Sequence, residues 1–222
     1  PQPFEVWVNG AEQPRGLGAV AKTLSMDMRA RDRAWLKYKL ETLARTAGED
    51  AFDLPMPPDG QVVRAPSAVA GFARVVACRC EELGAFSQPF DATPVMDSLF
   101  SRKEPKTGTD GTLSWTVDVI NPGTGDDFVL GLKELMLPDG ARRPYSMWLS
   151  GVYPRTLDGL CKLLSLDMRV IDPAWIGMKL RKLLHYPEPG GDFMARMPGE
   201  EKQLTWPSTI AYVARLIIHR YA

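Results

Sequence analysis

Residues 14–40 read PRGLGAVAKTLSMDMRARDRAWLKYKL, and residues 154–180 read PRTLDGLCKLLSLDMRVIDPAWIGMKL. The two stretches align without a gap at an offset of 140, and 14 of the 27 positions are identical. An average composition would supply roughly two identities by chance. The chain therefore contains two copies of one supersecondary unit, and this duplication decides the fold.

The match continues on both sides when the offset becomes 141. Upstream, residues 3–10 correspond to residues 144–151. Downstream, residues 52–74 correspond to residues 193–215. The repeated unit is therefore longer than the stretch of strongest identity.

The second copy carries a leading hairpin that the first copy lacks. Leu113–Ile120 and Phe128–Leu132 alternate between apolar and polar residues, and the turn between them is rich in Gly, Pro, Asn and Asp. The turn Pro138-Asp139-Gly140 then leads into a strand at Tyr145–Leu149. The first copy begins at the equivalent strand, Phe4–Val8. Either its own hairpin lies outside this sequence, or this strand joins the sheet of the other copy.

Each copy continues with three predicted helices. In the second copy they begin near Leu157, at the capping pair Asp172-Pro173 and near Pro207-Ser208. The last helix runs to Tyr221, and its counterpart spans residues 66–83. A Pro- and Gly-rich loop is predicted between the second and third helices.

These elements predict an α+β fold, with two copies of a small antiparallel-sheet-plus-helices unit related by an approximate two-fold pseudo-symmetry. The first repeat takes residues 1–84. Residues 85–111, rich in Pro, Ser, Asp and Gly, form a connector. The second repeat, with the complete hairpin, takes residues 112–222.

Charge and cysteine content limit the classes of function. Lys plus Arg number 27 and Asp plus Glu number 27, so no global field attracts nucleic acid or an anionic membrane. The last helix is locally basic at Arg215, His219 and Arg220, but nucleic-acid binding is not expected. No apolar run is long enough to span a bilayer. Three cysteines and no signal-like start predict a cytoplasmic protein.

The apolar residues shared by the copies are expected to form the core, and the shared polar residues are the candidates for binding. The expected core pairs are Trp7 with Trp148, Trp35 with Trp175, Leu24 with Leu164 and Met28 with Met168. Lys22, Ser25 and Arg29 lie on one stripe of a helix, at i, i+3 and i+7, and Lys162, Ser165 and Arg169 repeat that stripe.

Such a stripe could hold a phosphate or a carboxylate of a partner. The alternative, which we favour, is structural. Arg29 and Arg169 would then satisfy carbonyls at the helix end and pair with Asp32 and Asp172.

Cys78 and Cys80 are the candidates for redox chemistry. Positions i and i+2 of a helix point about 200° apart, so a disulfide between them is disfavoured. His185 and His219 lack the spacing of a metal site, and no metal is expected. No Ser/His/Asp or Cys/His arrangement can be assembled, so no catalytic residues and no autonomous active site are predicted.

Three segments carry a resemblance to a known family, Lys106–Trp115, Pro144–Trp148 and Leu160–Val170. They resemble the TSCPD-type domain near the C-terminus of adenosylcobalamin-dependent (class II) ribonucleotide reductases. The whole chain is similar to the duplicated version of that domain. In the family it ends the long enzyme or forms a small chain beside the large catalytic one.

The resemblance implies an accessory role. The chain would be a non-catalytic domain or subunit of a vitamin B12-dependent ribonucleoside-diphosphate reductase, supporting assembly or activity of the large catalytic region in DNA precursor synthesis. Adenosylcobalamin would belong to the holoenzyme and not to this chain. Many TSCPD domains have cysteines that suggest zinc, but Thr109 and Asp110 stand where a cysteine is expected. No zinc is therefore predicted.

Two other functions stay open at this stage. One is a regulatory nucleotide-binding module that uses the stripe of Lys22, Ser25 and Arg29 or its counterpart. The other is an electron relay in which Cys78 and Cys80 pass electrons to thioredoxin. A homodimer is also compatible with the sequence.

Overall fold

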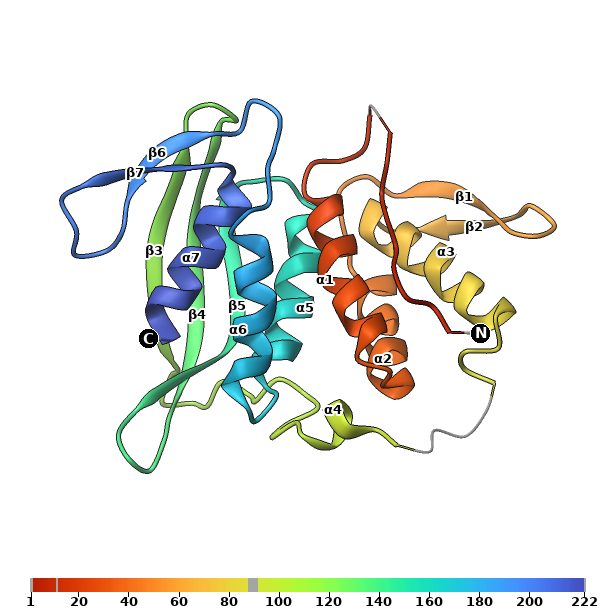
Figure 1. The fold of residues 1–222 in the computed structure, drawn as a ribbon, viewed down its shortest axis with the longest axis horizontal. Helices are drawn as coiled ribbons and strands as arrows, with labels where there is room; N and C mark the ends of the chain where they lie inside the picture. Colours follow the sequence, from red (N-terminus) through yellow and green to blue (C-terminus); the bar gives the residue numbers. More distant parts are fainter. Residues whose placement is uncertain (1, 11, 88–91, 222) are drawn as a thin grey trace. The chain divides into compact units, whose positions relative to one another are not determined.

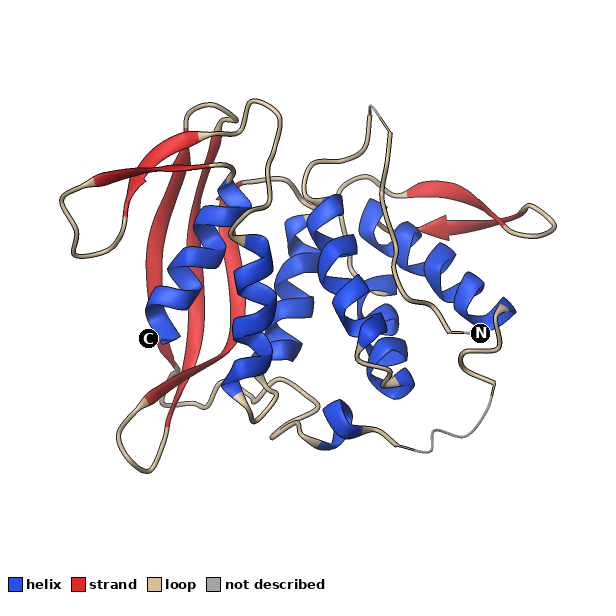
Figure 2. Cartoon of the chain, in the orientation of Figure 1, coloured by secondary structure: helices blue, strands red, loops and turns tan. Residues whose placement is uncertain are grey.

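The computed structural model describes residues 2–10, 12–87 and 92–221, and it is an α+β structure with small antiparallel sheets (Figures 1 and 2). The chain divides into two compact units. Unit 1 consists of residues 1–99 and 155–163, and unit 2 consists of residues 100–154 and 164–222. The repeat boundaries stay a prediction, because they follow sequence identity whereas the units follow compactness.

Unit 1 is mainly helical, with one two-stranded hairpin (Figure 1). Strands β1 and β2 pair in register from Phe52 opposite Ala65 to Met56 opposite Gln61. Helix α5 (Leu157–Met168) contributes its residues up to Leu163 to this unit. The other elements of unit 1 are α1 (Leu17–Arg29), α2 (Arg33–Ala44), β1 (Phe52–Met56), β2 (Gln61–Ala65), α3 (Ala68–Glu82) and α4 (Pro94–Asp97).

Unit 2 contains a three-stranded antiparallel sheet in the order β3-β4-β5, and α7 packs against β3. Buried apolar residues of the sheet, including Leu130, Leu132 and Tyr145, contribute to the core. A second hairpin, β6-β7, corresponds to β1-β2 of unit 1. The elements are β3 (Leu113–Asn121), β4 (Asp126–Met136), β5 (Arg142–Val152), α6 (Pro173–Leu183), β6 (Phe193–Arg196), β7 (Gln203–Trp206) and α7 (Thr209–Tyr221).

Matched capping residues start the equivalent helices of both units. The Ser67 hydroxyl accepts a hydrogen bond from Ala70 N at 3.1 Å and donates one to Thr46 O at 2.7 Å. Ser208 does the same with Ala211 N at 3.0 Å and Tyr186 O at 2.6 Å. One serine thus starts a helix and ties it to the preceding loop, which explains its presence in both copies.

Most predicted elements are confirmed. The hairpin of the second copy is β3-β4, the strand after it is β5, and the third helices are α3 and α7. The loop predicted after α6 is only partly a loop, because it contains strand β6 and leads into strand β7. Four-residue strands with few β-branched residues give little signal in a segment rich in Pro and Gly.

The prediction of a strand at Phe4–Val8 is wrong. The segment is extended beside α1 (Figure 1), but no strand in the described part of the chain pairs with it. Trp7 and Trp148 are also not core residues, because they are 79% and 36% exposed. A strand needs a neighbour to accept its ladder of hydrogen bonds, and unit 1 supplies none of the β3-β4 type.

Candidate functional site

The polar stripe of α1 fastens the N-terminal segment to the helix. Ser25 is buried. Its Oγ accepts a hydrogen bond from Val6 N at 3.0 Å and donates one to Ala21 O at 2.9 Å. Arg29 forms an ion pair with Glu5 at 3.0 Å, and its guanidinium lies 4.8 Å from the centroid of the Phe4 ring. Two of the three stripe residues therefore hold residues 4–6 in place.

The pairing expected between Arg29 and Asp32 is not the one that forms. Asp32 is buried and accepts hydrogen bonds from Trp35 N at 2.9 Å, Val95 N at 2.8 Å and Met96 N at 3.1 Å. Its carboxylate thus caps α2 and also holds the start of α4. Lys22, the remaining residue of the stripe, is half-buried.

The second stripe is divided between the units, with Lys162 in unit 1 and Ser165 and Arg169 in unit 2. Ser165 Oγ accepts a hydrogen bond from Met147 N at 2.9 Å, which repeats the contact between Ser25 and Val6. Arg169 is buried, and its carbonyl accepts a hydrogen bond from Phe100 N at 3.0 Å. Both shared serines therefore join an extended segment to a helix.

A buried ion pair is repeated in both copies, and its pairing was not predicted from the sequence. Lys39 Nζ lies 3.0 Å from Asp27 Oδ2, and Lys179 Nζ lies 3.2 Å from Asp167 Oδ1; all four side chains are fully buried. In each copy the indole nitrogen of a tryptophan, Trp35 or Trp175, donates to the same aspartate at 2.7 Å. The sequence did contain a sign of this ion pair, because both copies keep the same lysine and aspartate among shared residues that mostly belong to the core.

The ammonium groups of these pairs also lie over the tryptophan rings. Lys39 Nζ is 4.7 Å from the centroid of the Trp35 ring, and Lys179 Nζ is 5.3 Å from that of Trp175. Buried charges persist only where they are paired and hydrogen-bonded. The ion pair and the indole contact meet that condition, so these residues stabilise the helix pair and do not form an open reactive site.

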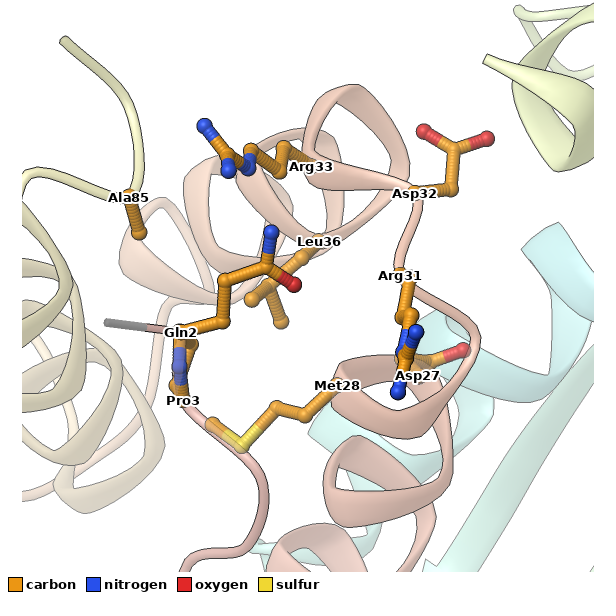
Figure 3. A pocket seen from close by; sticks show the side chains of 9 residues that line it. All are labelled: Gln2, Pro3, Asp27, Met28, Arg31, Asp32, Arg33, Leu36 and Ala85. Carbon is orange, nitrogen blue, oxygen red and sulfur yellow. The ribbon is translucent and has the colours of Figure 1, made fainter. Parts of the chain in front are cut away.

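A small pocket lies beside the first ion pair (Figure 3). Gln2 lies among Arg33, Leu36 and Met28, whereas the Asp32 carboxylate points away from the pocket. Its volume of about 10 Å³ is room for one water molecule. A nucleotide or a corrinoid does not fit this pocket.

The environment of the cysteines disfavours thiolates. Burial raises the pKa of the Cys80 thiol to about 11, and the Glu81 carboxylate adds to the rise. Desolvation and the carboxylates of Glu82 and Glu81 also raise the pKa of Cys78. All three cysteines are free thiols, and burial raises the pKa of Cys161 as well. Reactive thiols need a lowered pKa, so these positions do not favour a relay.

Residues 2–10, 12–87 and 92–221 contain neither a group of metal ligands nor a membrane-spanning helix. No three His, Cys, Asp or Glu side chains in these ranges are grouped so that they could hold a metal ion. No helix in the same ranges is both long enough and apolar enough to cross a bilayer.

The clearest candidate for a binding surface is a set of side chains that are more exposed in unit 1 than their counterparts are in unit 2. Phe4 is 65% exposed, whereas Tyr145 at the same repeat position is 1% exposed. Val75 of α3 is 38% exposed, and its counterpart Leu216 is fully buried. We call Phe4, Trp7, Val75 and Arg79 the open face of unit 1.

The β3-β4 hairpin accounts for the covering in unit 2. Gly131 of β4 lies directly opposite Trp148, the counterpart of Trp7. A Cβ at Gly131 would lie 2.1 Å from Trp148 Cε2, so only glycine allows this close approach. Glu134 of β4 pairs with Arg220, the counterpart of Arg79.

Among the described residues, Arg79 has no such sheet partner. Its side chain is 68% exposed and pairs with Glu82 of its own helix at 2.9 Å. The open face is therefore the surface that a β3-β4 hairpin would cover if unit 1 had one.

No family model, curated protein or solved structure matches this chain, so its functional assignment rests on these contacts and on its sequence motifs.

Proposed function

We propose that this chain is a non-catalytic accessory domain or subunit of a class II, vitamin B12-dependent ribonucleotide reductase. It docks on the large catalytic region and supports its assembly or activity in the cytoplasm. The observation that carries this proposal is the open face of unit 1, where Phe4 and Trp7 are more exposed than their counterparts Tyr145 and Trp148 in unit 2. Exposed apolar groups of this kind are typical of interaction surfaces.

The use of the shared polar residues supports the same role. Ser25, Arg29 and Ser165 hold extended segments, and Asp27 and Lys39 hold two helices together. These groups are engaged in the fold and offer little to a substrate. In this proposal the nucleotide chemistry and adenosylcobalamin belong to the large region.

The proposal includes the relation between the two copies. Their matched contacts support two versions of one module, and we propose that the versions are related by an approximate two-fold axis. A crystal structure in which unit 2 superposes on unit 1 after a rotation of about half a turn would support it. A simple translation between the units would contradict it.

Co-purification with the large chain of a class II reductase tests the docking role. We expect the two chains to migrate together on size exclusion, and reductase activity to increase when this chain is added. Trp7→Glu is expected to abolish both effects, because it places a charge on the open face. Met194→Glu is the matched control, since Met194 is an exposed apolar residue of unit 2. If the unaltered chain neither migrates with the large chain nor changes its activity, the proposal is wrong.

A further inference from the structure

Unit 2 shows what the N-terminal segment of unit 1 lacks. In unit 2, β5 pairs along its length with β4 in antiparallel register, and Trp148 lies against Gly131. Glu134 is buried and binds the guanidinium of Arg220 with Nη2 at 2.8 Å from Oε2. Arg220 also lies over the Trp115 ring of β3, 5.7 Å from its centroid. The β3-β4 hairpin thus supplies the strand that pairs with β5, the glycine opposite Trp148 and the carboxylate that binds Arg220.

Unit 1 keeps the half of this interface that belongs to the strand and the helices. The bond from Val6 N to Ser25 Oγ is the counterpart of the bond from Met147 N to Ser165 Oγ. Residues 3–10 are therefore held against α1 by the contact that holds β5 against α5. An extended segment can accept another strand along one edge.

We propose that residues 3–10 receive an antiparallel β-strand from a β-hairpin of a separate partner polypeptide. The incoming strand has glycine opposite Trp7, and a carboxylate near its C-terminal end that reaches Arg79. This inference rests on the proposed docking role and names the surface and the chemistry of the partner.

Charge complementarity supports the acidic residue. Arg79 occupies the position of Arg220, and its present partner Glu82 lies three residues along the same helix. Such surface pairs contribute little to stability, so Arg79 can exchange that partner at low cost. The buried Glu134 of unit 2 shows the kind of residue that this position accepts.

One contact of unit 2 is not expected at the partner interface. Thr209 of α7 accepts a hydrogen bond from Asn121 of β3 and donates one to Asp126 of β4. Ala68 stands at the position of Thr209 in unit 1 and cannot form either bond. The partner hairpin is therefore held by strand pairing, the Trp7 contact and the Arg79 ion pair.

A peptide with the sequence of residues 112–137 of this chain serves as the probe, because it is the hairpin that fits the equivalent site. The full chain carries 5-fluorotryptophan, and the ¹⁹F signal of Trp7 is assigned from the Trp7→Phe variant. We expect the peptide to shift the Trp7 signal with saturation and to leave the Trp148 signal unchanged, since Trp148 already faces Gly131.

Two peptide variants test the stated chemistry. Gly131→Val in the peptide should weaken binding by about tenfold or more, because a side chain there collides with the indole. Glu134→Lys should also weaken it, and Arg79→Glu in the chain should restore binding of that peptide. Arg79 is exposed, so this variant is expected to fold.

The outcomes separate this inference from the docking role. Absence of a Trp7 shift, or equal binding of the Gly131→Val peptide, overturns the inference even if the chain migrates with the reductase. Concentration-dependent dimerisation that Trp7→Glu abolishes also overturns it, because a second copy would then be the occupant. Peptide binding without any association with the reductase would instead contradict the proposed function alone.

Discussion

Lys39 and Asp27 form an ion pair in which neither side chain is exposed, and Lys179 and Asp167 repeat it. Each pair joins two consecutive helices, and a tryptophan on the second helix donates to the aspartate. Two copies of one sequence thus solve the same local packing problem with the same charged residues. The duplication provides a matched control for every substitution at these positions.

Removal of either buried ammonium should strongly destabilise the chain. Lys39→Met leaves the Asp27 carboxylate buried without its counter-ion, and we expect the free energy of unfolding to fall by about 3–5 kcal/mol. Lys179→Met should have a loss of the same size. Urea unfolding followed by circular dichroism measures both.

The exposed lysines of the same helices are the controls. Lys37→Met and Lys182→Met are expected to change the free energy of unfolding by about 0.5 kcal/mol or less. If the buried and exposed substitutions have equal effects, the ion pairs are not structural determinants.

The two shared serines, Ser25 and Ser165, should differ in their contribution to the free energy of unfolding. Ser165→Ala leaves Met147 N, which belongs to a buried residue, without its acceptor, at a cost of about 1–3 kcal/mol. Ser25→Ala should cost less, because Val6 is only half-buried and water can replace the hydroxyl. Urea midpoints compare the two variants. A larger loss for Ser25→Ala would show that residues 4–8 are as firmly packed as β5.

Arg79 of α3 and Arg220 of α7 should differ even more in their contribution to the free energy of unfolding. Arg220→Met leaves the buried Glu134 without its partner, and we expect a loss of about 2–3 kcal/mol. Arg79→Met removes only a surface pair and should change stability by about 0.5 kcal/mol or less. Thermal unfolding of both variants tests this. Equal losses would mean that unit 1 already holds a buried partner for Arg79.

The raised pKa of Cys80 predicts that the free energy of unfolding falls as the pH rises in the alkaline range. Burial raises the pKa of Cys80 in the folded chain from 9.0 to about 11, so the folded state binds that proton more tightly than the unfolded state. The resulting stability is present below about pH 9 and is lost as the pH rises toward about 11. Urea midpoints should therefore fall less between pH 8 and pH 10.5 in Cys80→Ala than in the unaltered chain. Identical pH slopes would show that Cys80 ionises freely, as a relay thiol must.

The sequence predicted those parts of the fold in which local pattern and local structure agree. The helices that begin at Leu17, Pro173 and Thr209 follow apolar periodicity and capping residues. The β3-β4 hairpin follows from alternation and its turn. These features need only neighbouring residues, so a single sequence displays them.

The remaining features depend on contacts between distant residues. Phe4–Val8 corresponds to the strand at Tyr145–Leu149 in the repeat, but whether it becomes a strand depends on a partner strand that its own residues do not encode. The pairing of Lys39 with Asp27 was not expected because lysine and aspartate ordinarily mark a solvated surface. Only the identity of both residues in the second copy distinguished them from surface charges.

Hydrogen–deuterium exchange of the chain with and without the large class II reductase chain tests the docking claim most directly. In the free chain we expect the amides of residues 4–10 other than Val6, which is bonded to Ser25, to exchange rapidly, and those of β5 to be protected by β4. In the complex, residues 4–10 should become protected by about tenfold or more, with β5 unchanged. A complex in which residues 4–10 exchange as fast as in the free chain would contradict docking through the open face.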